Sequence, residues 1–173
     1  YTGVQLSAEL YGLEQVEIMK GPSSALYGQG PLGGLVNLVS KHPQDENFLN
    51  LQASYGSYGS YEGDFDGNAV LSDSVNGRLV ALFRHSGEFT QHVGGNDRTY
   101  IAPSLTWNID ADTQLTVLAS LQHDDGDSSF PLTYIGGVVP GPVGHRYPLD
   151  RYTGEPGRSN ITKSNRDAIG YEF

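Results

Sequence analysis

The sequence lacks cysteine, so the chain forms no disulfide and offers no thiolate to a metal ion. No run approaches 18 consecutive apolar residues, which excludes a transmembrane helix. Basic residues number 10 against 20 acidic ones, and the net charge of −10 argues against a nucleic-acid backbone as partner. The chain starts at Tyr1 without an initiator methionine or a signal-like segment, so we expect it to be a piece of a longer protein.

The sequence is rich in glycine and tyrosine, and apolar and polar residues alternate along much of it with a period of two. Its 23 glycines and 11 tyrosines are typical of a β-rich protein with many turns. The alternation predicts strands near residues 49–55, 61–71, 77–86, 99–109, 114–122 and 165–173. We expect one face of two of these strands to carry Ile101, Leu105, Trp107, Leu115, Val117 and Leu121. The opposite face then carries Tyr100, Ser104, Thr106, Thr116 and Ser120.

The lengths of the strands and of their connections favour a transmembrane β-barrel. Runs of roughly 9 to 11 residues suit a tilted strand that crosses a bilayer. Tight turns at 73–77 and 110–113 alternate with longer connections at 87–98 and from 123 to about 160. Short turns at one end and long loops at the other are usual in outer-membrane barrels. A soluble sheet with one polar face would show a similar alternation, so periodicity alone leaves both architectures open.

The candidate motifs for nucleotide or metal binding each lack a residue or a flanking element that such a site requires. Residues 28–33 fit G-x-G-x-x-G, but a strand-like run follows them where a dinucleotide site needs a helix. The acidic run at 124–127 lacks the glutamate that closes a calcium loop, and the five histidines lack zinc-ligand spacing. We therefore predict no enzyme activity, no metal site and no covalent cofactor. The arginines and tyrosines of the long connection fit an anion-binding loop and an ordinary exposed loop equally well.

A distinct segment precedes the alternating strands and carries the most specific pattern in the chain. Residues 13–43 read LEQVEIMKGPSSALYGQGPLGGLVNLVSKHP: a short strand near 15–20, a helical turn at 24–27, a glycine-rich stretch and a strand near 35–40. This run closely resembles the end of the plug in TonB-dependent siderophore receptors. Gln15, Leu32 and His42 depart from the pattern of that family. The later run IAPSLTW at 101–107 is similar to a strand of the ferrichrome-type branch.

The resemblance implies a fragment of a plugged, 22-stranded transmembrane β-barrel. Residues 1–43 would be the C-terminal part of the plug, and residues 44–173 the first six or so antiparallel barrel strands, forming an open sheet. The function implied is uptake of a ferric siderophore across the outer membrane of a Gram-negative bacterium. The implied partners are the siderophore, outer-membrane lipid and the TonB complex of the inner membrane, whose coupling box lies outside the sequence.

The resemblance also implies roles for individual residues. Lys20 matches a basic residue that locks the plug by pairing with barrel glutamates, which we expect beyond residue 173. Tyr1 and Thr2 lie near the plug loop that touches siderophore in relatives. Phe130 lies where the ferrichrome branch carries aromatic ligand contacts at the start of its third outer loop, although Pro131 replaces an aromatic residue found in some relatives. Tyr134 is a further candidate ligand contact, as one of the tyrosines of the long connection.

Two rival interpretations stay open at this point. The first is a receptor of the same architecture for another cargo, such as haem, cobalamin or a sugar. The second is a small outer-membrane β-protein without transport activity. Six strands are fewer than the roughly eight of the smallest closed barrels, so such a protein would have to oligomerise.

Overall fold

The computed structural model describes residues 8–21, 34–88, 95–127, 140, 144–148, 150–151 and 161–173. Within these residues the chain forms two antiparallel sheets, which confirms the all-β prediction. The smaller sheet is a hairpin of β1 (Leu13–Lys20) and β2 (Gly34–Ser40). The larger holds β3 (Phe48–Tyr55), β4 (Tyr61–Ser72), β5 (Val75–Ser86), β6 (Asn96–Asn108), β7 (Gln114–Asp127) and β8 (Ile161–Glu172).

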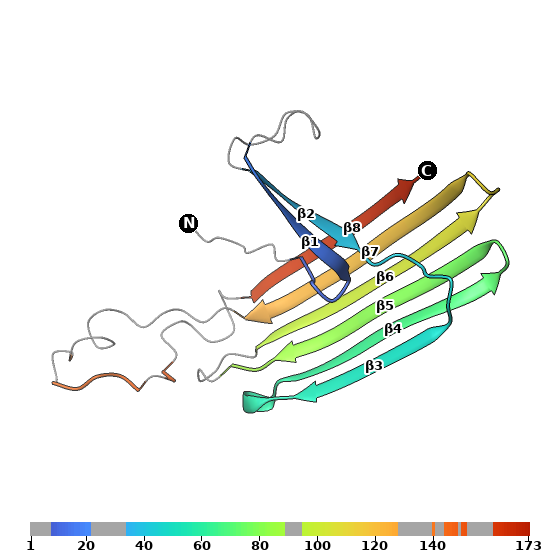
Figure 1. The fold of residues 1–173 in the computed structure, drawn as a ribbon. Coiled ribbons are helices and arrows are strands. Elements are labelled where there is room, and N and C mark those ends of the chain that lie inside the picture. Colours follow the sequence, from blue (N-terminus) through green and yellow to red (C-terminus); the bar gives the residue numbers. More distant parts are fainter. Residues whose placement is uncertain are drawn as a thin grey trace.

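The larger sheet is an open, curved meander. Each strand pairs with the next one in the sequence, and β3 and β8 form the two edges (Figure 1). The prediction of five consecutive strands between residues 47 and 124 is confirmed. Among the described residues of that range, the only helical element is the short turn Ser57–Gly59. In the part of the chain that the structure describes, no helix has the length and apolar character needed to cross a membrane.

Strand bounds differ most from the prediction where polar residues continue a strand. β7 runs to Asp127 rather than to residue 122, and β8 begins at Ile161 rather than at 165. The ladder continues because backbone hydrogen bonds do not depend on apolar side chains, as in the pairing of Asp97 with Asp125. The prediction stopped short because apolar and polar residues no longer alternate at 123–127 and 161–164. The predicted helical turn at 24–27 lies outside the described residues.

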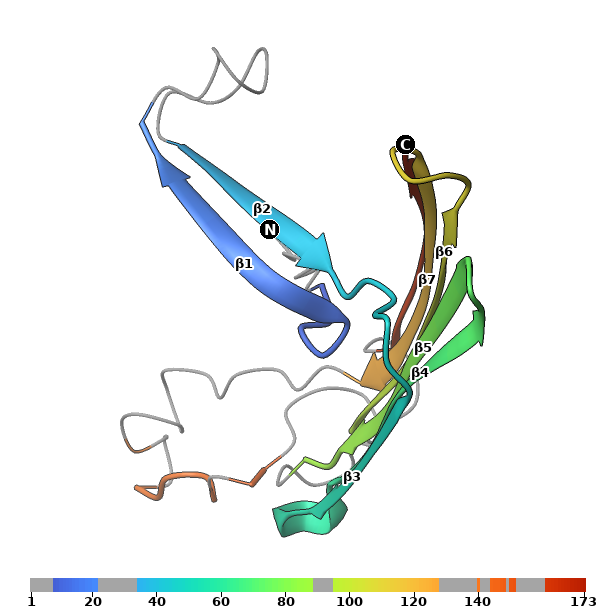
Figure 2. The ribbon, with the colours of Figure 1, turned by 45° about the vertical axis from the view of Figure 1, so that its right-hand side comes forward.

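The two faces of the sheet differ as predicted. The concave face looks toward the β1–β2 hairpin (Figure 2). Thr106 and Thr116 are buried on this side, and their hydroxyl oxygens lie 3.0 Å apart. Trp107, which follows Thr106 directly, is 46% exposed on the opposite, convex face. Because neighbouring residues of a strand point to opposite faces, one strand supplies both a polar concave surface and an apolar convex one.

Residues 77–86 alternate less regularly in the sequence than the other predicted strands, and the structure of β5 explains why. Val80 and Leu82 lie on the concave face and are only 2% exposed, and with Tyr100 of β6 they form a small apolar core. Tyr11, from the segment that precedes β1, packs against this core. Two apolar residues therefore interrupt a polar face at the place where the hairpin approaches it.

The hairpin contacts the sheet through the residues at its open end, which we call the hairpin base: residues 9–12 before β1 and Lys41 after β2. The base is closed by a hydrogen bond from the Lys41 amide to the Gly12 carbonyl, 3.0 Å long. Gly12 lies so close to the sheet that a Cβ there would stand 2.1 Å from the Tyr100 hydroxyl oxygen. Only glycine permits this approach without displacing the tyrosine ring.

Candidate functional site

The candidate site is the surface where the hairpin base meets the concave face of the sheet. Four charged side chains of consecutive strands share one row of the ladder there: Glu62 of β4, Arg84 of β5, Arg98 of β6 and Asp124 of β7. Directly paired residues of adjacent strands carry their side chains on the same face. The row therefore presents two guanidinium groups flanked by two carboxylates.

Glu9 of the hairpin base completes this row. Its carboxylate is buried, and Oε2 lies 3.0 Å from Nη1 of Arg84 and 3.0 Å from Nη1 of Arg98. Burial raises the pKa of the Glu9 carboxyl, but hydrogen bonds from Arg98, from the Tyr11 amide and from Arg84 outweigh it. They hold the pKa below its ordinary value. Glu9 is therefore a carboxylate that two strands of the sheet grip together.

The two arginines keep partners of their own within the sheet. Arg84 Nε donates to Glu62, and Arg98 Nε donates to Asp124 over 2.5 Å. We call the five side chains Glu9, Glu62, Arg84, Arg98 and Asp124 the arginine cluster. Because its guanidinium donors are shared between carboxylates, the cluster joins the hairpin base to four strands at once.

A second ionic contact lies on the same face and involves the other half of the hairpin base. Arg78 of β5 donates to both oxygens of Asp66 of β4, over 2.8 and 2.9 Å. Lys41 Nζ lies 2.8 Å from Asp66 Oδ2 and 4.2 Å from the centre of the Tyr11 ring. We call Lys41, Asp66 and Arg78 the Asp66 cluster. It attaches the end of β2 to the sheet.

The chain that follows the base is held by two asparagine side chains of the sheet and by Arg78, whose Nη1 donates to the His42 carbonyl over 2.8 Å. The side chain of Asn68 accepts a hydrogen bond from the Gln44 amide and donates to the carbonyls of Gln44 and Glu46, at 2.9, 2.7 and 2.5 Å. Asn76 donates to Asp45 over 2.5 Å. Both asparagines are buried. The side chains of Asn68 in β4 and Asn76 in β5 therefore fix residues 44–46 to the sheet.

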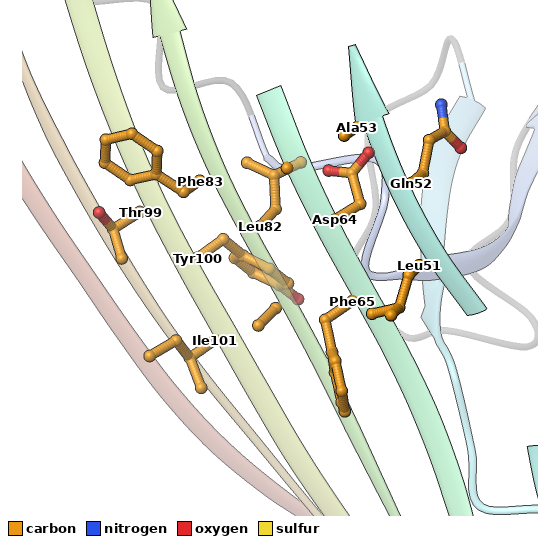
Figure 3. A pocket seen from close by; sticks show the side chains of 12 residues that line it. Leu51, Gln52, Ala53, Asp64, Phe65, Leu82, Phe83, Thr99, Tyr100 and Ile101 are labelled. Atoms are coloured by element: carbon orange, nitrogen blue, oxygen red, sulfur yellow. The ribbon is translucent and has the colours of Figure 1, made fainter. Parts of the chain in front are cut away.

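The convex face offers no comparable chemistry. A hollow of about 470 Å³ is lined mainly by apolar side chains, among them Leu51, Phe65, Phe83 and Ile101 (Figure 3). At Gly63 the hollow is open, since no atom lies within 4 Å of the position a Cβ would take. Among the described residues, no cluster of His, Asp or Glu could hold a metal ion. The polar groups that converge do so on the concave face.

Comparison with known proteins gives this arrangement its context. No protein-family model matches the chain. The metal-pseudopaline receptor CntO of Pseudomonas aeruginosa is 36% identical over 159 residues, which are 88% of this chain and 21% of the relative. The ferrichrome outer membrane transporter/phage receptor of Escherichia coli is 35% identical over 167 residues, 94% of this chain and 22% of the relative. The chain belongs to the family of TonB-dependent siderophore receptors.

The chain spans about a fifth of the length of these relatives. The closed form of the ferric-catecholate import receptor Fiu of Escherichia coli shares its fold, with a TM-score of 0.78 at 23% identity. That comparison covers 94% of this chain and 24% of the solved chain. The open sheet with a hairpin on its concave face is therefore the architecture of part of a plugged receptor barrel.

As a member of this receptor family, the chain is part of a protein of the Gram-negative outer membrane. Its convex face fits that location, because exposed aromatic side chains stand near both ends of the strands. Tyr55, Tyr61 and Phe83 lie toward the end with long connections, while Trp107 and Tyr171 lie toward the end with tight turns. Aromatic girdles at both interfaces border the apolar band of an outer-membrane barrel.

Of the five predicted site residues, the structure describes only Lys20. Lys20 is exposed at the end of β1 and forms no ion pair with any described residue. Tyr1, Thr2, Phe130 and Tyr134 lie outside the described residues. Lys20 is part of neither the arginine cluster nor the Asp66 cluster, and the roles of all five residues stay predictions.

The sequence reasoning missed the residues that do hold the hairpin base. Arg78 and Arg84 had a usable signal, because both fell on the polar face of a predicted transmembrane strand, where a charge needs a partner. Lys41 lies in the family-like run, but that pattern does not indicate its ion pair with Asp66. Glu9 had no signal at all, since it lies before that run, in a stretch without recognisable periodicity. Only the folded chain brings it beside Arg98, 89 residues away.

Proposed function

We propose that the chain is part of an outer-membrane receptor that takes up a ferric siderophore in a TonB-dependent step. The observation that carries the proposal is the docking of a plug-like hairpin, through its base, onto the polar concave face of barrel-type strands. In such a receptor the chelate binds from outside above the plug, and the TonB complex pulls the plug from the periplasm. We propose that residues 1–43 belong to the plug and residues 44–173 to the barrel.

The names of the relatives support a metal chelate as the class of cargo. CntO is named a metal-pseudopaline receptor, and the Escherichia coli relative a ferrichrome transporter. A receptor of the same architecture for haem, cobalamin or a sugar is the second candidate function. It has no support among the relatives described above, whereas the chelate class has two. The non-transporting β-protein is disfavoured, since both relatives are named for receptor or transport activity.

We propose that ligand contacts come from the plug apex and the outer loops, with Tyr1, Thr2, Phe130 and Tyr134 as contributors. The described part of the long connection supports a loop that can meet an anionic chelate. There the Arg151 guanidinium lies 4.5 Å from the centre of the Tyr147 ring. A stacked arginine keeps its charge and its donors available to a ligand carboxylate or catecholate. We propose that Lys20 locks the plug once the rest of the barrel is present.

Uptake by cells tests the proposal. The full-length receptor that contains this chain is expressed in a Gram-negative strain without its own siderophore receptors. Radio-iron is then supplied as hydroxamate, catecholate or pyoverdine-type chelate, with haem and cobalamin as competing cargoes. The proposal predicts receptor-dependent uptake of at least one ferric chelate. Uptake of haem or cobalamin alone would move the function to the second candidate.

A further inference from the structure

The turn that closes the β3–β4 hairpin carries three tyrosines within seven residues. Residues 55–61 read YGSYGSY, a tandem repeat of aromatic, glycine and hydroxyl residues without a charge. The turn lies at the end of the sheet where β7 ends and β8 begins (Figure 1). This is the end with the long connections, which faces outward in an outer-membrane barrel. The repeat therefore lies at the outer surface of the receptor.

The three tyrosine side chains are accessible from outside the barrel wall. Tyr55 is 81% exposed, Tyr58 69% and Tyr61 46%. Tyr55 and Tyr61 are direct ladder partners and share the convex face, where the Tyr61 ring stacks on His85 with ring centres 5.1 Å apart. The convex face looks away from the barrel interior, so these rings do not meet a cargo in the lumen. Their partner belongs to the outer layer of the surrounding membrane.

The turn is held in one shape by its own backbone and by the residue that follows β5. The Gly56 amide donates to the Ser60 carbonyl over 2.8 Å, and the Ser60 amide donates to the Ser57 carbonyl over 3.2 Å. Ser60 Oγ accepts a hydrogen bond from the Gly87 amide over 2.9 Å. Gly87 lies so close to the turn that a Cβ there would stand 2.0 Å from the Tyr58 carbonyl oxygen. Because the turn is fixed in advance, a ligand loses little affinity to ordering it.

Tyr58 adopts a backbone conformation that bulky residues rarely have. Its φ of 59° and ψ of 25° lie in the left-handed region. Glycine occupies this region without strain, as Gly59 does with a φ of 76°. Strain of this kind persists where the surrounding structure enforces it, and it is concentrated at functional sites. The turn itself would accept glycine at residue 58, so the presence of a ring there points to a role in recognition.

The chemistry of the repeat indicates which class of ligand it fits. Residues 55–61 contain no lysine, arginine or histidine, so the repeat offers no cation to a phosphate group. A sugar ring presents C–H groups on its faces and hydroxyl groups around its edge. The negative face of an aromatic ring attracts the C–H groups, and serine hydroxyls can exchange hydrogen bonds with the sugar hydroxyls. Tyrosine, serine and glycine also dominate antibody combining sites, where rigid rings supply contact area and small residues supply adaptable hydrogen bonds.

We propose that residues 55–61 form a docking surface for the saccharide of the outer-leaflet glycolipid, the lipopolysaccharide that surrounds a receptor in the Gram-negative outer membrane. Tyr58 stacks on a sugar of the oligosaccharide core, while Tyr55 and Tyr61 contact the glycolipid closer to the membrane. The inference goes beyond the proposed transport function and does not depend on the cargo. It requires only that the chain lies in the outer membrane.

Binding of purified lipopolysaccharide to the full-length receptor in detergent tests the proposal. Two probes are compared, one with a complete oligosaccharide core and one truncated to lipid A with its innermost acidic sugars. The variants Tyr58→Ala and Tyr58→Phe separate loss of the ring from loss of the hydroxyl. Tyr171→Ala is the matched control, because Tyr171 is 78% exposed on the same convex face but lies at the opposite end of the strands.

Tyr58→Ala should weaken binding of the complete form roughly two- to tenfold, the effect expected for one aromatic stacking contact. Tyr58→Phe and Tyr171→Ala should bind the complete form as the native receptor does, and the truncated form should not distinguish the variants. Equal binding of the complete form by Tyr58→Ala and the native receptor would overturn the proposal. A loss of the same size with the truncated form would also overturn it, because the ligand would then be the lipid rather than the saccharide.

Cross-linking in cells covers the case in which Tyr58→Ala does not assemble. Photoreactive benzoylphenylalanine at residue 58 of the full-length receptor keeps an aromatic ring in the turn. Irradiation should attach it to lipopolysaccharide with a complete core and not to the truncated form. The same amino acid at residue 171, at the inner end of the strands, should attach to neither. Cross-links from residue 58 to a protein in place of the glycolipid would refute the proposal and make the turn a protein-binding surface.

Discussion

Nη1 of Arg98 lies 3.0 Å from Oε2 of Glu9, although 89 residues separate the two along the chain. This contact joins the segment before the first hairpin strand to the fourth strand of the barrel-type sheet. Arg84 supplies a second guanidinium to the same carboxylate oxygen.

Replacing the wall residue should harm the receptor more than replacing the hairpin residue. Arg98→Gln takes its guanidinium partner from Asp124 and one of two guanidinium partners from the buried Glu9, and we expect a loss of about 3–5 kcal/mol. Glu9→Gln leaves each arginine with a carboxylate partner, and we expect a loss of about 1–2 kcal/mol. Thermal unfolding of the full-length receptor in detergent measures both. Equal losses would show that Arg98 stabilises the arginine cluster no more than Glu9 does.

The docking of the hairpin base should persist to acid pH. The pKa of Glu9 lies below its ordinary value of 4.5. Its stabilising contribution is therefore complete above that ordinary value and is lost as the pH falls through the lowered pKa. The difference in melting temperature between the native receptor and Glu9→Gln should be constant above pH 4.5 and shrink below it. A difference that shrinks on raising the pH would contradict the assigned direction.

A side chain at residue 12 should push the hairpin off the sheet. In Gly12→Ala the new Cβ would stand 2.1 Å from the Tyr100 hydroxyl oxygen, so the ring or the hairpin must shift. We expect a destabilisation of about 1–3 kcal/mol, the usual range for overpacking. Replacing the ring in the same molecule, as in Gly12→Ala with Tyr100→Val, should recover part of the loss. If the second change adds its own full cost, the close approach is not the cause.

Neighbouring positions of β7 should differ only by the face on which they lie. Leu121 is 50% exposed on the convex face, and Ser120 points to the concave side. Leu121→Arg places a charge against lipid, at a cost of about 2–4 kcal/mol near the bilayer midplane. Ser120→Arg places the same charge in the polar interior and should be milder. Assembly of the full-length receptor into outer membranes compares the two, and equal defects would contradict the assignment of faces.

The chain on its own should require detergent. β3 and β8 each pair on one side only, and their apolar side chains are exposed, with Leu51 at 69% and Ile169 at 81%. Unpaired edges template aggregation in water. Expression of the 173-residue chain should therefore yield inclusion bodies. A monodisperse, detergent-free monomer with a cooperative thermal transition would oppose this expectation.

Period-two alternation was enough to predict most of the sheet. Ile101 and Trp107 alternate with Tyr100 and Thr106 without exception, because one face meets lipid and the other a polar interior. The same rule failed at Val80 and Leu82, where a local apolar contact with the hairpin base outweighs the polarity of the face. Alternation reflects the average environment of each face of a sheet and does not predict a local apolar contact such as this one.

The candidate site was much less predictable than the fold. A family-like run drew attention to Lys20, which is exposed in this part of the receptor. The residues that grip the hairpin base are pairs such as Glu9 with Arg98 and Lys41 with Asp66. Each pair joins residues distant in the sequence, and the register of the strands decides which charges meet. A sequence without an alignment carries no record of that register.

Uptake through a plugged barrel should depend on a working TonB complex. Surface binding and uptake of a ferric chelate by the full-length receptor are compared in cells with and without a working TonB complex. We expect equal binding in both cells, and receptor-dependent uptake only where TonB is present. Equal uptake in both cells would contradict it, because a plug docked on the barrel wall would then not control passage.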